Sequence, residues 1–131
     1  MLGQDANELL NTLREAKKVI DKFLNAPPDA DAIVVFNGMC DMKDLTIRLE
    51  EMCSNTLSLE EQKKFCIENR MELMWDLFAC SKRLLVWHEN RTNPRAIPHG
   101  NPTIERENLT RNAINIDKWF ISPLIRYITG R

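Results

Sequence analysis

The stretch from residue 70 to residue 87, RMELMWDLFACSKRLLVW, limits more than any other what this chain can fold into. It contains neither proline nor glycine, and it follows Ser58-Leu59-Glu60-Glu61, the pattern of a helix-capping box. No stop signal occurs between this box and Asn90. The sequence therefore predicts one helix over 58–90, roughly 46 Å long at about 1.5 Å per residue.

Apolar side chains occupy most sides of this predicted helix. A surface helix normally has one apolar stripe opposite a broad polar face. Here only a narrow strip is reliably polar: Glu68, Glu72, Asp76 and Arg83. The simplest way to cover such a helix is a bundle in which it is central. Trp75 and Leu77 are then core residues, and truncating either to alanine is expected to cost about 2–5 kcal/mol.

Two helices are predicted before this central one. Apolar residues at positions 2, 6, 9, 13, 16, 20 and 23 line one helical face, and the helix ends before Pro27 and Pro28. Asp29 is expected to cap a second helix that runs to about residue 53, with Asp31 in its first turn. Residues 33–36 have strand-like composition, but the chain offers no second strand for them to pair with.

A fourth helix is predicted after a loop over residues 90–102, which holds three prolines and a glycine. Thr103 is its expected cap, and Gly130 its expected end. Ser122 followed by Pro123 has the pattern of an N-cap with proline at the first helical position, so a kink or restart is expected near Pro123.

The predicted fold class is therefore all-α. We expect a single domain over residues 1–131, an antiparallel bundle of four main helices with a long central third helix. The fourth helix is kinked or broken near Pro123. Because the chain begins with methionine and stops just after a helix, an N-terminal domain of a longer protein is an open alternative.

Composition and the chain start bear on location. Hydrophobic residues at 44% and charged residues at 28% are ordinary for a globular domain. No apolar run approaches the roughly 20 residues that span a bilayer, and the N-terminus lacks the pattern of a secretory signal. We expect an intracellular, cytoplasmic protein without a membrane partner; a nuclear location stays open.

Residues able to carry catalysis are scarce. His88 and His99 have no companion at metal-ligand spacing, and the four glycines are too isolated to form a phosphate-binding loop. The sequence predicts no catalytic residue, no metal and no cofactor, and hence not an enzyme. The cysteines lack a C-x-x-C pair; reduced core thiols are expected, with a disulfide framework as the alternative, for Cys40, Cys53, Cys66 and Cys80.

The surplus of apolar surface on the third helix indicates a non-enzymatic interaction or assembly module. Methionine and aromatic side chains recur in grooves that accept a partner's amphipathic helix. We expect such a groove beside the third helix, binding a helical segment of a partner protein; a second copy of the chain is an alternative occupant. The expected groove residues are Met39, Met42, Met71, Met74, Trp75 and Phe78.

Two other functions stay open at this point. Residues 1–76 carry 15 acidic and 9 basic side chains, whereas residues 77–131 carry 4 acidic and 9 basic ones, which would suit RNA binding by the second half. The candidate residues are Arg83, Arg91, Arg95, Arg106, Arg111 and Lys118. A secreted helical-bundle ligand is the second alternative, suggested by glycosylation sequons at residues 90–92 and 108–110.

Overall fold

A computed structural model describes residues 3–27, 30–90, 92–93, 95 and 101–130, and within these ranges the chain is helical and contains no strand. The all-α prediction is therefore confirmed. In chain order the elements are α1 (Gln4–Leu24), α2 (Ala32–Met39), α3 (Met42–Thr56), α4 (Leu59–Lys64), α5 (Ile67–Glu89), α6 (Pro102–Ile116), the π-helical turn η2 (Asp117–Ile121) and α7 (Ser122–Thr129).

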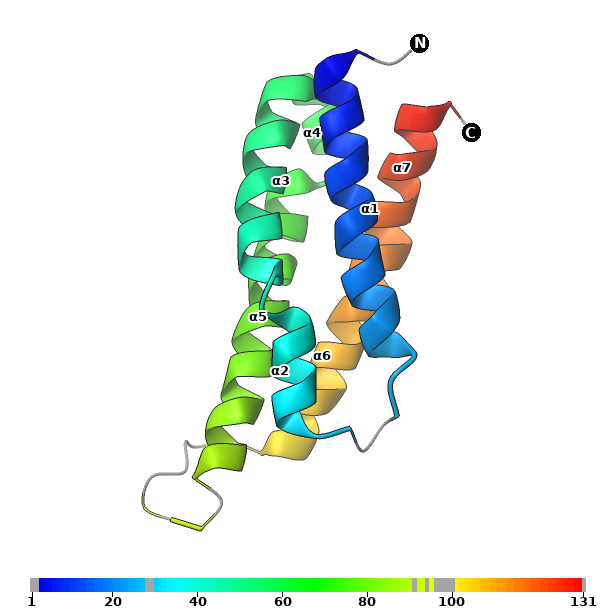
Figure 1. The fold of residues 1–131 in the computed structure, drawn as a ribbon. Coiled ribbons are helices and arrows are strands. Elements are labelled where there is room, and N and C mark those ends of the chain that lie inside the picture. Colours follow the sequence, from blue (N-terminus) through cyan, green and yellow to red (C-terminus); the bar gives the residue numbers. More distant parts are fainter. Residues whose placement is uncertain (1–2, 28–29, 91, 94, 96–100, 131) are drawn as a thin grey trace.

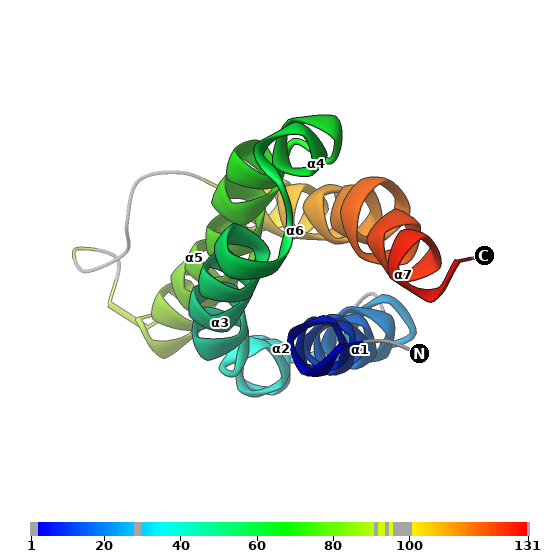
Figure 2. The same ribbon diagram turned by 90° about the horizontal axis from the view of Figure 1, so that it is seen from above.

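The helices lie side by side along one long axis. Helices α1 and α5 run in one direction, and α2–α3 and α6–α7 run in the other (Figure 1). Seen from above, they surround a common interior (Figure 2). Helix α5 packs against α2, α3, α4 and α6, whereas α1 packs mainly on α2, α3, η2 and α7. The predicted long third helix corresponds to α5. It is not central to the bundle, because α1 lies on the other side of the core and packs mainly against other helices.

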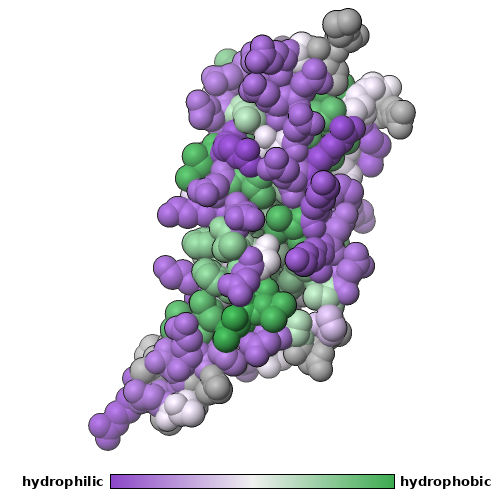
Figure 3. Space-filling view, in the orientation of Figure 1, coloured by the Kyte–Doolittle hydropathy of each residue, from purple (hydrophilic) through white to green (hydrophobic). Residues whose placement is uncertain are grey.

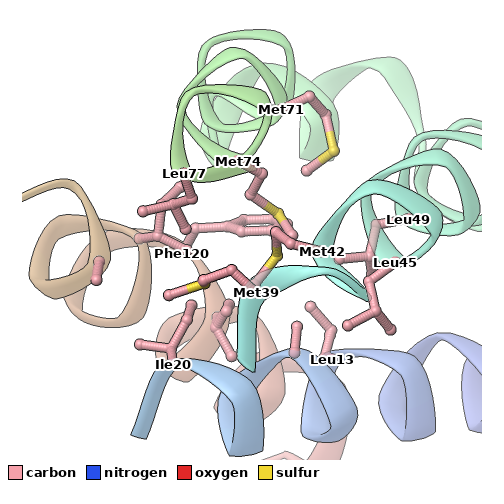
Figure 4. Close-up of a cluster of buried hydrophobic side chains, with 14 of the residues drawn as sticks. Leu13, Ile20, Met39, Met42, Leu45, Leu49, Met71, Met74, Leu77 and Phe120 are labelled. Carbon is pink, nitrogen blue, oxygen red and sulfur yellow. The ribbon is translucent and has the colours of Figure 1, made fainter. Parts of the chain in front are cut away.

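Phe120 of η2 occupies the middle of the core. Its side chain is fully buried, with Met74 and Leu77 of α5 on one side and Met39 and Met42 on the other (Figure 4). The apolar spacing that predicts the first helix also holds, since these members of the stripe are buried: Leu9, Leu13, Ala16 and Ile20. One interior thus joins residues from all four predicted helical regions.

The prediction of one continuous second helix is wrong. Helix α2 ends at Met39 and α3 begins at Met42, with a turn between them. The break follows Asn37 and Gly38, two residues of low helix propensity. The N-cap of α2 is Asp31, whose carboxylate accepts a hydrogen bond from the Ile33 amide. The expected cap, Asp29, lies outside the described residues.

The predicted 58–90 helix is also broken. The capping box of Ser58 and Glu61 is confirmed, but it opens only the short α4. Cys66 then adopts a left-handed backbone with φ of 52°, and α5 begins at Ile67. A left-handed residue at a helix end is usually glycine or asparagine, so a cysteine at this position does not indicate a break. The break turns α4 away from the axis of α5 and lets Phe65 pack against Tyr127.

The fourth helical region differs from expectation at both capping sites. Asn101, not Thr103, caps α6: its side chain accepts a hydrogen bond from the Thr103 amide, and Pro102 stands at the first helical position. Ser122 does not cap a restarted helix. Its hydroxyl donates to Asp117 at 2.7 Å, and its amide closes the wide turn of η2 on the Asp117 carbonyl.

A π-helical turn therefore lies just before Pro123, where a kink or break is expected. Proline has no amide hydrogen to donate to the preceding turn, and a π turn is a common way to accommodate such a missing bond. The ladder is widened just before Pro123, and the chain continues into α7 without a separate cap. Gly130 ends α7 in the left-handed region, with φ of 77°, as expected.

All four cysteines are free, but only Cys53 and Cys80 are buried. Cys40 and Cys66 are exposed, one at each unforeseen helix break. The prediction of four core thiols is therefore wrong for these two. The reason is the same in both cases: the cysteine is a capping residue at a helix end, Cys40 after α2 and Cys66 before α5, and does not lie on a continuous helical face.

Helix α4 is held against α7 by one short set of contacts. The Tyr127 hydroxyl donates a hydrogen bond to the Glu61 carboxylate, the Tyr127 and Phe65 rings meet at a centroid distance of 5.2 Å, and the Lys64 ammonium lies 4.9 Å from the Tyr127 ring centroid. None of the residues of α4 itself is buried. These contacts therefore do much to fix the position of α4.

The Glu61–Tyr127 contact predicts a pH dependence. The Tyr127 hydroxyl, together with the Ser58 amide, holds the pKa of Glu61 below its ordinary value of 4.5. Tyr127→Phe should raise this pKa, measured by carbon-13 NMR titration of the Glu61 carboxyl. A carboxyl whose pKa is lowered on folding contributes stability above its unfolded pKa and loses it as pH falls. The difference in unfolding free energy between the natural chain and Tyr127→Phe should thus be largest near neutral pH and should decrease below about pH 4.5. Identical Glu61 titrations in the two proteins would contradict the contact.

Candidate functional site

Two clefts flank α5, and they are the candidate sites. The larger, here the α5–α6 cleft, has a volume of about 850 Å³ and lies between the start of α2, the last turns of α5, and α6. The residues that define it are Ala32, Leu84, Trp87, Arg106, Arg111 and Ile114. It is an open groove, with a size at the upper end of the roughly 300–1,000 Å³ of ligand pockets.

The floor of the α5–α6 cleft is apolar and the edge is basic. Leu84 and Trp87 are each only 5% exposed and form the α5 wall. On α6, Ile114 is 47% exposed although it is a large aliphatic residue. Arg106 and Arg111 stand on the same helix, about two turns and one turn before Ile114, so apolar and cationic groups share one wall.

Arg106 is fixed in place at this edge. Its guanidinium donates a hydrogen bond of 2.6 Å to the Ala30 carbonyl, which ties α6 to the segment entering α2. Nearby, His88 Nδ1 lies 3.7 Å from the Asp31 carboxylate. Glu107 is the acidic group among the described residues that line the cleft. The edge therefore carries an excess of positive charge with a preset geometry.

Apolar surface also continues outside the α5–α6 cleft. Ile33 and Val34 of α2 are 42% and 60% exposed, directly after Ala32 at the cleft wall. Hydrophobic residues gather over this part of the molecule in Figure 3. The face presented by α2 and the cleft is therefore wider than the groove alone.

The second site, the α4–α5 cleft, lies between α3, α4 and α5 and has a volume of about 590 Å³. Its apolar lining consists of Leu59, Ile67, Met71 and Trp75, and its carboxylates are Glu50, Glu68 and Glu72. The Trp75 indole nitrogen donates a hydrogen bond of 2.8 Å to the Glu50 carboxylate. This cleft is thus acidic where the α5–α6 cleft is basic.

The residues predicted to form a groove beside the third helix divide between core and surface. Met39, Met42 and Met74 are fully buried, so they pack the interior and do not line a groove. Met71 and Trp75 do meet at a cleft, the α4–α5 cleft. Phe78 is half-buried, with its ring centroid 6.1 Å from that of Phe36. Methionines at helical spacing do not by themselves indicate a groove, because a buried helix face has the same spacing.

The predicted basic residues do not gather into one patch. Arg83 forms a two-pronged ion pair with Glu105, with nitrogen–oxygen distances of 3.0 and 3.1 Å. The Lys118 ammonium lies 5.0 Å from the Trp119 ring centroid. Arg95 is exposed, and Arg91 lies outside the described residues. Arg106 and Arg111 are the pair that the structure brings to a common site, the α5–α6 cleft.

The buried thiols and the metal-ligating side chains of the described residues have well-defined surroundings. Burial raises the pKa of the Cys53 thiol to about 12 and is the main cause that raises that of Cys80 to about 11, so both thiols stay protonated at neutral pH. No group of three histidine, cysteine or carboxylate side chains in the described ranges is arranged to hold a metal ion. Over the same residues, every helix is too short or too polar to cross a membrane.

The sequence pointed to only a few residues of each cleft, Met71 and Trp75 at one and Arg106 and Arg111 at the other, because neither cleft is formed by a continuous motif. Ile114 and Leu59 are ordinary members of apolar patterns in the sequence, and only their exposure of 47% and 76% sets them apart. The one usable signal was the uneven charge of the two halves, which places acidic residues at one cleft and arginines at the other.

Comparison of this chain with protein-family models, with curated proteins and with solved structures gives no match.

Proposed function

We propose that this chain is a non-enzymatic interaction module, an antiparallel bundle of four helical rods that binds a partner protein through the α5–α6 cleft. The proposed occupant is an amphipathic helical segment that bears carboxylates. A cytoplasmic location belongs to the same proposal. The sequence suggests a binding groove beside the third helix, lined by methionines that prove to be mostly buried. The proposed groove lies instead beside the C-terminal half of that helix, α5.

The observation that carries the proposal is an apolar groove with a cationic edge. Leu84 and Trp87 supply a floor able to receive aliphatic side chains. Arg111 is exposed beside Ile114, so a carboxylate one turn from an apolar anchor would meet a guanidinium. Helix-in-groove recognition uses this combination of anchors and rim charges.

RNA binding is less well supported by the same residues. The Arg83 guanidinium is already paired with Glu105, and that of Arg106 is bonded to the Ala30 carbonyl. A nucleic-acid face needs several cations free to meet successive phosphates. The half-exposed Trp119 ring already has the ammonium of its neighbour Lys118 over it, 5.0 Å from the ring centroid. The basic half of the chain therefore suits a single carboxylate-bearing segment better than a phosphate backbone.

The test is a substitution in the cleft that leaves the core untouched. The probe is a synthetic amphipathic peptide of leucine, alanine and glutamate, about 20 residues long so that it is helical alone. Ile114→Glu places a carboxylate against the glutamates of the probe and removes an apolar contact. Calorimetric titration should show that the natural chain binds the peptide. The Ile114→Glu variant should bind it with an affinity at least about tenfold lower.

Ile47→Glu on α3 is the matched control. Ile47 is 45% exposed, against 47% for Ile114, and the substitution brings the same change in charge. We expect the control to bind the probe as the natural chain does. Equal losses in both variants, or no binding to the natural chain, would overturn the proposal. Stronger binding of a single-stranded oligonucleotide than of the peptide would favour the RNA alternative instead.

A further inference from the structure

We infer that the α4–α5 cleft is a second docking site, specific for a helical segment that carries lysine or arginine beside apolar anchors. This site is separate from the α5–α6 cleft, and its occupant has the opposite charge. A chain with both sites would hold two different partner segments at once. The inference therefore goes beyond the proposed function and does not depend on it.

The apolar part of this site combines one strongly exposed leucine with a buried base, since Ile67 and Met71 are only 7% and 4% exposed. Leu59, at the first position of α4, is 76% exposed, more than any other large hydrophobic residue recorded for the described chain. It lines the same cleft as Ile67, Met71 and Trp75, which belong to the first turns of α5. An exposed leucine at the mouth of an apolar groove matches the anchor contacts of a bound helix.

The polar part of the site selects the charge of the occupant. Glu68 and Glu72 are exposed, one turn apart on α5, and Glu50 faces them from α3. Lys63 is the cation among the described lining residues, so carboxylates outnumber it three to one. A cationic side chain entering this groove meets complementary charge, whereas an acidic one meets repulsion.

Two features hold the groove open in advance. The hydrogen bond from the Trp75 indole to Glu50 fixes the indole as a wall between α5 and α3. The left-handed backbone at Cys66 turns α4 aside, which creates the angle between α4 and α5 that the groove occupies. Had the helix continued straight through residue 66, Leu59 would lie on the extension of α5 and no groove would form there.

The test uses charge reversal with a matched control. The probe is a synthetic helical peptide of leucine, alanine and lysine, with the same apolar pattern as the glutamate peptide used above. The test variant carries Glu68→Lys and Glu72→Lys. The control carries Asp5→Lys and Glu8→Lys on α1, a helix that lines neither cleft, and has the same net charge. All four positions are exposed, so both variants should keep the helical circular dichroism of the natural chain.

We expect calorimetric titration to give binding of the lysine peptide that is at least about tenfold weaker in the test variant and within about twofold of the natural chain in the control. Equal losses in both variants would show attraction to overall charge and overturn the inference. So would unchanged binding in the test variant, binding of the glutamate peptide at this cleft, or self-association of the chain that Glu68→Lys with Glu72→Lys abolishes. Ile114→Glu should leave lysine-peptide binding unchanged, which separates this inference from the function proposed for the other cleft.

Discussion

Phe120→Ala should lower the free energy of unfolding by about 3–5 kcal/mol, the range expected when a fully buried aromatic side chain is truncated. The Phe120 side chain is fully buried at the point where α5, α2 and α3 meet η2 (Figure 4). Removing its ring leaves a cavity that Met74 and Leu77 cannot fill without shifting α5. The loss therefore combines lost burial with an unfilled space.

Urea unfolding followed by circular dichroism measures this loss directly. The control is Trp119→Ala at the adjacent position, where an equally aromatic side chain is 53% exposed and contacts Lys118. The control should cost no more than about 1 kcal/mol, the range of an exposed cation–π contact. Similar losses in the two variants would mean that the π turn presents its side chains in another orientation.

Leu77→Ala should cost about 2–5 kcal/mol, whereas Trp75→Ala should cost clearly less, although tryptophan is the larger residue. Leu77 is fully buried beside Phe120. Trp75 is only half-buried, at the α4–α5 cleft, where its indole donates to Glu50. The apolar pattern of the sequence alone places both residues in the core and predicts similar losses of stability. A smaller loss for Trp75→Ala than for Leu77→Ala would therefore support the structure over the sequence-based prediction.

The comparison needs both variants in the same unfolding series. The Trp75→Ala loss should be of the order of a hydrogen bond plus partial burial, about 1–2 kcal/mol. A Trp75→Ala loss equal to or above that of Leu77→Ala would place the indole in the core. The α4–α5 cleft would then lose one of its walls.

Helical faces were predictable because burial repeats with the helical period. Leu9 and Leu13 of α1 are buried as their spacing requires, and so are Val35 and Leu49 on either side of the unforeseen break between α2 and α3. The pattern survives that break because both segments still present their apolar residues to the same interior. Fold class and core could therefore be predicted from the sequence.

The breaks themselves could not be predicted. Cys66 adopts a left-handed backbone without being glycine or asparagine, and tertiary contacts of Phe65 with Tyr127 compensate for it. These contacts join residues more than sixty positions apart, so no local pattern reports them. At Pro123 the sequence marks the irregularity correctly, but it does not distinguish a new cap from the π turn that the chain adopts.

The sites were the least predictable part, because a groove depends on where breaks and packing leave a gap. Trp75 and Met71 were singled out for their type, and both line a cleft, although Met71 is only 4% exposed. Met39, Met42 and Met74 are fully buried core. Residue type and spacing do not distinguish Met71 from these three methionines. What distinguishes it is its place at the edge of the core, in the second turn of α5 after the break at Cys66.

The most direct test of a two-site interaction module is nitrogen-15 NMR of the labelled natural chain, titrated separately with the glutamate and the lysine peptides. We predict that the glutamate peptide shifts amide signals around Arg111 and Ile114 of α6, and that the lysine peptide shifts those around Leu59 and Glu72. When one peptide is already bound, adding the other should shift the same amide signals as it does when added alone. Signals that move together for both peptides, or shifts confined to residues outside the two clefts, would show that the chain does not have two separate docking sites.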